Sequence, residues 1–240
     1  MNVAVDPALP RVQSAGGWAA LFVALAYLVG FAVMATALSP PESQQRSPAE
    51  LLAFLLDRKL LFQLWMVFIY VLAGGAIVVL SVALHERLKQ DAPDAMQIAT
   101  PFGLIWAGLV IASGMVAISG LESVAAFHTE SVDLATTVWA SVDVLQNGLG
   151  GGIEIVGGVW MLLVSTASFR VAGLPKLLSF YGALIGVIGI VTVIPPLKEL
   201  ATVFGLGQIL WFAGVGASML HRSRGRTESG GPTAAHAPQS

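Results

Sequence analysis

A carboxylate lies inside one of the long apolar stretches of this chain. The segment VDVLQNGLGGGIEIVGGVW, residues 142–160, carries Asp143, Gln146, Asn147 and Glu154 among apolar residues and glycines. A charged side chain that faces lipid is costly, so Glu154 is expected to point towards protein partners or water. We therefore predict that Glu154 is the charge-bearing or protonatable group of a polar binding site.

Three amides are candidate partners for this carboxylate. Asn147 precedes Glu154 by seven residues, a spacing that places both on one face of a continuous helix. Gln63 and Gln208 fall in the outer parts of two other apolar stretches. The predicted binding site is therefore Glu154, Gln63, Asn147 and Gln208, with the amides orienting a ligand. Amides of this kind also act as ordinary hydrogen-bonding links between membrane helices, at about 0.6 kcal/mol each.

Two alternatives to a binding site remain open. Glu154 could belong to a structural ion pair with Lys198 or Arg58 in a non-catalytic scaffold. A weaker alternative is an enzyme acting on a lipid or isoprenoid, which would use outer carboxylates such as Glu122, Glu130 and Asp133. The chain contains no cysteine, and its four histidines are scattered. We predict no enzyme activity, no catalytic residue, no metal site and no cofactor.

Composition defines the elements that must position these residues. Of 240 residues, 56% are hydrophobic and 11% are charged, against about 25% charged in a soluble domain. A helix needs roughly 20 apolar residues to cross a bilayer, which indicates spans at about 18–38, 60–84, 98–120, 134–169, 177–194 and 200–220. We predict an all-α bundle of six transmembrane helices over 17–220, with tails at 1–16 and 221–240, the latter disordered. The net charge of -2 argues against a nucleic-acid partner.

The distribution of cations predicts the orientation in the membrane. Six spans place both termini on one side, and the loops and tails of that side hold eight of the twelve Lys and Arg residues, against four on the other. Because Lys and Arg collect in cytoplasmic loops, both termini are predicted to be cytoplasmic. Residues 35–37, Ala-Thr-Ala, resemble a signal-peptide cleavage site, but the preceding apolar run is long, so we retain 18–38 as a span.

The glycines of the fourth span allow two interpretations. Counting about 20 residues back from Arg170 places the outer membrane boundary near residues 148–151, with Glu154 just inside. Gly148-x-x-x-Gly152 and Gly182-x-x-x-Gly186 match the small-residue pattern of close helix packing, which is the interpretation we favour. The alternative is a helix broken at 148–152, with unwound backbone lining a cavity.

The first outer loop contains a helix start. Ser47 and Glu50 form a Ser-x-x-Glu capping box, and Pro48 suits the first helical position. A short helix is expected here, lying along the outer interface and leading into the second span.

Landmarks in the last three spans resemble a known family. Glu154, Gly157, Gly158 and Trp160 form Glu-x-x-Gly-Gly-x-Trp, and Leu174-Pro175 and Gln208 with Trp211 follow. In these residues the chain is similar to the bacterial six-helix membrane proteins of domain-of-unknown-function family 4386, over about residues 17–220. The resemblance implies a multi-pass protein of a bacterial plasma membrane and implies no activity.

These observations lead to one functional hypothesis. We expect a multi-pass protein embedded in the lipid bilayer that binds a small solute, an ion or a proton in an outward-facing polar pocket around Glu154. Such a protein would be transporter-like or ligand-sensing. The sequence does not name the solute or the oligomeric state.

Overall fold

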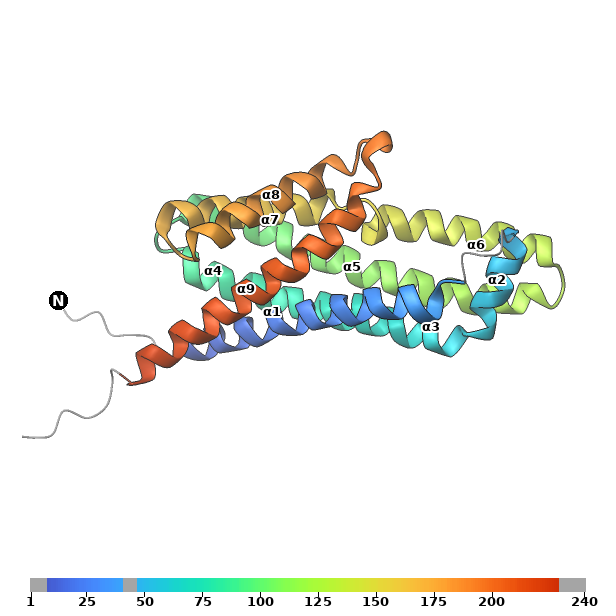
Figure 1. The fold of residues 1–240 in the computed structure, drawn as a ribbon, viewed down its shortest axis with the longest axis horizontal. Helices are drawn as coiled ribbons and strands as arrows, with labels where there is room; N and C mark the ends of the chain where they lie inside the picture. Colours follow the sequence, from blue (N-terminus) through green and yellow to red (C-terminus); the bar gives the residue numbers. More distant parts are fainter. Residues whose placement is uncertain (1–7, 41–46, 229–240) are drawn as a thin grey trace, which may run out of the picture.

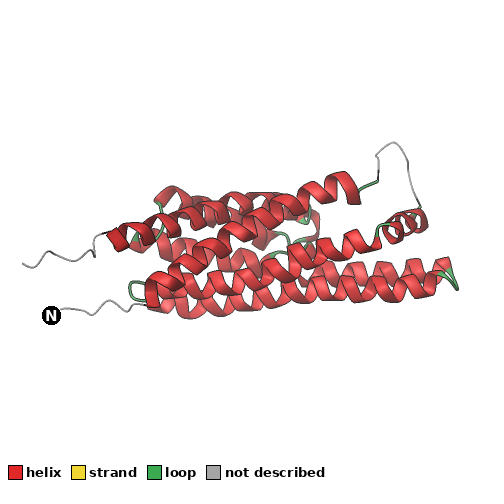
Figure 2. Cartoon of the chain, turned by 90° about the horizontal axis from the view of Figure 1, so that it is seen from below, coloured by secondary structure: helices red, strands yellow, loops and turns green. Residues whose placement is uncertain are grey.

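The computed structural model describes residues 8–40 and 47–228, with side chains described between residues 11 and 221, and this part of the chain is helical apart from short connections. The longer helices run along a common direction (Figures 1 and 2), and no strand occurs in these ranges. Three π-helical turns, η1 to η3, and one 3-10 turn, η4, interrupt or link the α-helices. In chain order the elements are α1 (Ala8–Val33), η1 (Met34–Leu38), α2 (Pro48–Asp57), α3 (Lys59–Met66), η2 (Val67–Leu72), α4 (Ala73–Leu88), α5 (Pro93–His128), α6 (Val132–Gln146), η3 (Asn147–Gly151), α7 (Ile155–Val171), α8 (Lys176–Val191), η4 (Pro195–Leu197) and α9 (Leu200–Glu228).

Five helical segments of the described residues are long and apolar enough to cross a membrane. They are Arg11–Leu38, Lys59–Leu88, Pro93–His128, Val132–Val171 and Leu200–His221. The sixth expected span, α8, has 16 residues, or about 24 Å at 1.5 Å per residue, against a hydrocarbon core of about 30 Å. The expected class, an all-helical protein with several apolar helices, is confirmed. The number of spans and the cytoplasmic side of the termini stay predictions.

Both ends of the helical chain lie at the same end of the bundle. Figure 1 shows α1 beginning and α9 ending at the end where the α4–α5 and α7–α8 connections also lie. The two end helices are longer than the sequence indicated, because α1 begins at Ala8 and α9 continues to Glu228. The rest of the two predicted tails, residues 1–7 and 229–240, lies outside the described residues.

The capping box at the start of α2 is confirmed. The Ser47 side chain accepts a hydrogen bond from the backbone N–H of Glu50, and the Glu50 carboxylate accepts one from the backbone N–H of Ser47 at 2.7 Å. Leu52 of α2 is buried with Val124 and Ala135, at the tip of the α5–α6 hairpin. The short helix therefore packs on that hairpin and leads directly into α3.

Glycines let α7 and α8 approach each other closely. A Cβ added to Gly158 would lie 2.6 Å from the carbonyl oxygen of Gly186, and one added to Gly186 would lie 2.7 Å from the backbone nitrogen of Leu162. A Cβ on Gly182 would collide with the Trp211 ring. The predicted small-residue packing is thus confirmed for Gly182-x-x-x-Gly186, which holds α8 against α7 and α9.

Aromatic rings fill the centre of the bundle. Trp106, Trp160 and Trp211, from α5, α7 and α9, are almost fully buried. Ring centroids are 5.4 Å apart for Trp106 and Trp160, and 5.6 Å apart for Trp160 and Trp211. Phe204 and Phe212 of α9 complete the cluster. Edge-to-face and offset aromatic contacts of this kind hold the three helices in a fixed relation.

The predicted fourth span is not one continuous helix. After α6 the chain makes the η3 turn, in which Gly150 has φ 128°, and α7 begins only at Ile155. A Cβ at Gly148 would meet nothing within 4 Å, so that glycine does not serve close packing. The packing interpretation of Gly148-x-x-x-Gly152 was therefore wrong, and the broken-helix alternative is correct. Glycine permits the break because it populates positive φ without a steric penalty.

The break lies where the bundle becomes thinner. The α5–α6 hairpin continues beyond the α8–α9 connection (Figure 1). Helix α5 has 36 residues, or about 54 Å, which exceeds a hydrocarbon core of about 30 Å. The broken segment thus lies at the foot of the hairpin, beside the ends of α1 and α8 and the beginning of α9.

Candidate functional site

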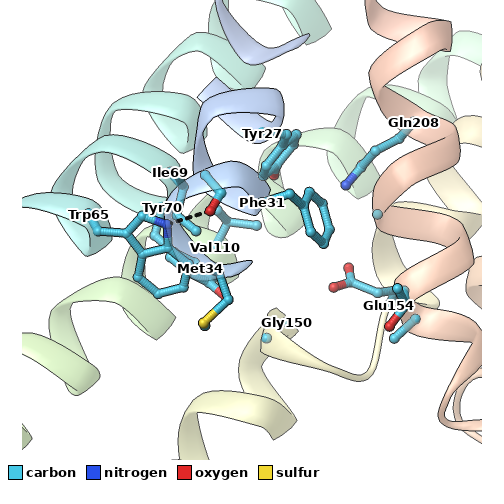
Figure 3. Close-up of a pocket in the computed structure, with 15 residues that line it drawn as sticks. Tyr27, Phe31, Met34, Trp65, Ile69, Tyr70, Val110, Gly150, Glu154 and Gln208 are labelled. Carbon is cyan, nitrogen blue, oxygen red and sulfur yellow. Dashed lines mark hydrogen bonds between the residues drawn. The ribbon is translucent and has the colours of Figure 1, made fainter. Parts of the chain in front are cut away.

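A cavity of about 200 Å³ lies beside the helix break. Figure 3 shows the side chains of Phe31, Glu154 and Gln208 directed towards the same space. The cavity is lined by Tyr27, Gly30, Phe31, Met34, Trp65, Ile69, Tyr70, Val110, Gly150, Gly151, Glu154, Ala201, Thr202, Gly205 and Gln208. Its volume equals that of roughly seven water molecules at about 30 Å³ each. The space is therefore sufficient for a small organic solute.

The exposed part of the cavity lining lies on the side away from the chain termini. Met34 follows the end of α1 and Ala201 lies at the beginning of α9, whereas Tyr27 and Gln208 line the cavity further along the same two helices. From Met34 to Tyr27 (34 − 27 = 7) and from Ala201 to Gln208 (208 − 201 = 7), the depth is about 10 Å at 1.5 Å per residue. Met34 is exposed at the rim, and Gln208 is buried.

All three π-helical turns of the described chain meet at this cavity. Met34 belongs to η1, Ile69 and Tyr70 to η2, and Gly150 and Gly151 to η3. A π-helical turn inserts an extra residue into a helix and is found frequently at functional sites. The convergence of three such turns from separate helices indicates that regular helix geometry is interrupted around this space.

Glu154 lies at the N-terminus of α7, where Thr192 holds its backbone. Its backbone N–H donates to the Thr192 hydroxyl at 2.8 Å, and that hydroxyl donates to the Gly189 carbonyl at 2.7 Å. Because Glu154 is the residue directly before α7, its carboxylate lies at the positive end of the helix dipole, which favours a negative charge. The buried Thr192 therefore fixes the backbone of Glu154 against α8 and leaves its side chain to the cavity.

The expected cationic partners of Glu154 are engaged elsewhere. Lys198 approaches Glu199 at 3.9 Å, and the Arg58 guanidinium lies 3.8 Å from the ring centroid of Phe54. Within the described side chains, no Lys, Arg or His lies within 4.0 Å of the Glu154 carboxylate. The structural ion pair with Lys198 or Arg58 is not formed.

Polar groups of the cavity wall have unused hydrogen-bonding capacity. Gln208 is 4% exposed, and its Oε1 has no hydrogen-bond partner among the described residues. The buried indole Nε1 of Trp106, which lines neither cavity, lies close to the Glu154 carboxylate but without hydrogen-bond geometry. Buried polar groups are normally paired, so the Gln208 oxygen marks a place where water or a ligand can bind.

A second cavity of about 200 Å³ adjoins the first. The two share Met34, Trp65, Tyr70 and Gly151 in their linings. At the boundary between them, Gln146 donates from Nε2 to the Tyr70 hydroxyl at 3.0 Å. The second cavity extends to Asp143, Asn147 and Trp139 of the hairpin.

The structure brings together two of the four predicted binding residues. Glu154 and Gln208 line the first cavity. Asn147 lines the second, where it donates to the Asp143 carboxylate at 3.0 Å. Gln63 lines neither cavity and donates to Glu122 at 2.6 Å.

Sequence reasoning missed the aromatic lining of the first cavity. Tyr27, Phe31, Trp65 and Tyr70 occur in apolar stretches, where aromatic residues are common and carry little functional signal. One clue was available, because two of the three tyrosines in the chain line this cavity. A phenol within an apolar span needs a polar neighbour.

The outer carboxylates of the enzyme alternative are separate from the site. Glu122 accepts from Lys59 Nζ at 2.7 Å as well as from Gln63. Neither cavity is lined by Glu122, Glu130 or Asp133. A catalytic site that combines Glu154 with one of these outer carboxylates is therefore not formed.

Comparison with known proteins gives no relative. No protein-family model, no curated protein and no solved structure matches the chain. The resemblance to family 4386 stays a prediction, and the functional argument rests on the geometry of the site.

Proposed function

We propose that this chain is a multi-pass membrane protein that binds a small solute in the cavity around Glu154. The observation that supports the proposal most directly is a carboxylate beside an open cavity without a paired cation among the described side chains. An intramembrane ionisable group that faces a cavity is typical of a ligand or ion pathway. Broken helices at such a site are typical of transporters.

The direction of the opening supports the same proposal. The cavity opens away from the chain termini, which we place in the cytoplasm of a bacterium because the Lys and Arg residues concentrate at that end. The binding site therefore faces the outside of the plasma membrane. A protein of this kind takes up or senses a solute from outside the cell.

Ligand-dependent stabilisation of the purified protein tests the proposal. A ligand that binds only the folded state raises the midpoint of thermal unfolding, so a panel of small solutes is screened in detergent. For an active solute, Glu154→Gln is expected to keep the fold, measured by circular dichroism and gel filtration, and to lose the shift. Glu199→Gln is the matched control, because Glu199 is 85% exposed in its side chain and lines neither cavity.

Two outcomes would contradict the proposal. One is a wild-type protein whose midpoint no solute shifts. The other is a Glu154→Gln variant that retains the full shift, since the carboxylate would then have no part in binding.

A further inference from the structure

Both cavities are lined by an acidic side chain and by no basic one among the described residues. Glu154 lines the first cavity and Asp143 the second, and neither lining includes Lys, Arg or His among the described residues. A low-dielectric cavity lined by one sign of charge concentrates ions of the opposite sign. A lining of this kind favours a cation over an anion.

Aromatic rings form much of the wall opposite Glu154. Tyr27 and Phe31 come from α1, Trp65 from α3 and Tyr70 from η2. Figure 3 shows Phe31 between Tyr27 and the Glu154 carboxylate. Trp65 is fixed by its Nε1, which donates to the Gly30 carbonyl at 2.9 Å, and its ring packs edge-on against Tyr70. Aromatic rings arranged around a space recognise alkylammonium groups, whose charge is attracted to the ring faces.

The donor set does not suit a metal ion. Hard cations such as Ca²⁺ take six to eight oxygen ligands, whereas the first cavity offers one carboxylate, the Gln208 amide and a few hydroxyl groups in a lining that is otherwise apolar and aromatic. Among the described residues, no group of three or more His, Cys, Asp or Glu side chains could hold a metal ion. An organic cation, in contrast, needs one counter-charge and an apolar surface.

We propose that the ligand is a small monovalent organic cation, a protonated amine or a quaternary ammonium compound. This inference rests on the proposed function, because it assigns the ligand class of that cavity. The cationic head lies between the Glu154 carboxylate and the rings of Phe31 and Tyr70. The amide of Gln208 lies at the floor and binds a hydroxyl or N–H group of the ligand.

The test compares a cation, a neutral molecule and an anion of similar size, together with one smaller cation. Choline and ethanolamine are the cationic probes, 3,3-dimethylbutan-1-ol is the neutral counterpart of choline, and 3,3-dimethylbutanoate is the anion. Binding to the purified wild-type protein is measured by calorimetry and by thermal shift. We expect at least one cation to bind about tenfold or more tightly than the neutral alcohol, and no binding of the anion.

Variants locate the cation within the cavity. Glu154→Gln is expected to abolish the preference for choline over the alcohol. Phe31→Leu is expected to weaken cation binding about three- to tenfold, without a comparable change for the alcohol. Phe22→Leu is the control on the same helix, because Phe22 packs against Phe68 and lines neither cavity.

The outcomes separate the ligand class from the proposed function. Binding of the alcohol or the anion with equal or higher affinity than both cations would overturn the cation assignment and leave solute binding intact. Absence of binding by every probe, and by the wider solute panel, would overturn both.

Discussion

Replacement of Gly158 by alanine tests whether α7 and α8 are in backbone contact. The added Cβ would lie 2.6 Å from the Gly186 carbonyl oxygen and 2.6 Å from the Ile190 nitrogen. Optimal non-bonded contacts are about 3.5 Å or more, so the two helices must separate by about 0.9 Å (3.5 − 2.6). The obstructing atoms belong to a helix backbone, which cannot move aside by a change of rotamer.

The expected magnitude follows from a comparison with a second glycine. Overpacking typically costs about 1–3 kcal/mol, and Gly158→Ala is expected at the upper end because the contact is with backbone. Gly75→Ala is the control, because Gly75 lies in α4 and its Cβ would meet nothing within 4 Å. Both variants gain the same helix propensity, about 1 kcal/mol. The difference between them therefore isolates the packing cost at about 3 kcal/mol, or roughly a hundredfold in the folding equilibrium.

Unfolding by sodium dodecyl sulfate in mixed micelles, followed by circular dichroism, measures this difference. Equal free energies of unfolding for Gly158→Ala and Gly75→Ala would refute the close approach of α7 and α8. A large loss in both variants would point to a general effect of glycine replacement instead.

Three further predictions concern the helix break, its anchor and the topology. Gly150→Ala is expected to lower the free energy of unfolding by about 1–3 kcal/mol, because φ 128° is unfavourable for alanine. Gly148→Ala is the control and is expected to change this free energy little, because its added Cβ also meets no neighbour within 4 Å. Equal effects of the two variants in micelle unfolding would contradict the helix break. Thr192→Val leaves the backbone N–H of Glu154 without its acceptor and is expected to lower the free energy of unfolding by about 1–3 kcal/mol. Thr166→Val, on an exposed helix face, is the control and is expected to change the free energy of unfolding little. The chain has no native cysteine, so single cysteines can report the orientation in the membrane. An impermeant maleimide is expected to label Thr129→Cys in intact cells and Asp91→Cys only after permeabilisation. The reverse labelling pattern would contradict the proposed orientation.

Glu154 could be predicted as a site residue from the sequence, because a carboxylate within an apolar stretch is informative by itself. Gln208 was predicted in the same way, as a polar residue within an apolar stretch. Asn147 was assigned to the same face as Glu154 on the assumption of an unbroken helix, seven residues apart. The η3 turn and the positive φ of Gly150 change the direction of the chain between the two residues, so the assumption failed.

Lateral contacts between helices could not be read from spacing. Gln63 has the right residue type and approximate depth, but it faces Glu122 beside Lys59 rather than the cavity. Which neighbours a helix face contacts depends on how helices are arranged around one another, and that information is absent from a periodic pattern. The aromatic lining escaped for the same reason, because Phe31 and Trp65 resemble ordinary lipid-facing or core residues until the neighbouring helices are placed.

The contact between Trp106, Trp160 and Trp211 gives the protein an internal optical probe. Three of its six tryptophans are packed with ring centroids 5.4 to 5.6 Å apart at successive contacts and are shielded from solvent and lipid. Indoles this close couple their electronic transitions, so the cluster should give a strong near-ultraviolet dichroism signal that disappears when α5, α7 and α9 separate. Because Trp106 also lies beside Glu154, its emission is expected to respond to occupancy of the cavity without any attached label.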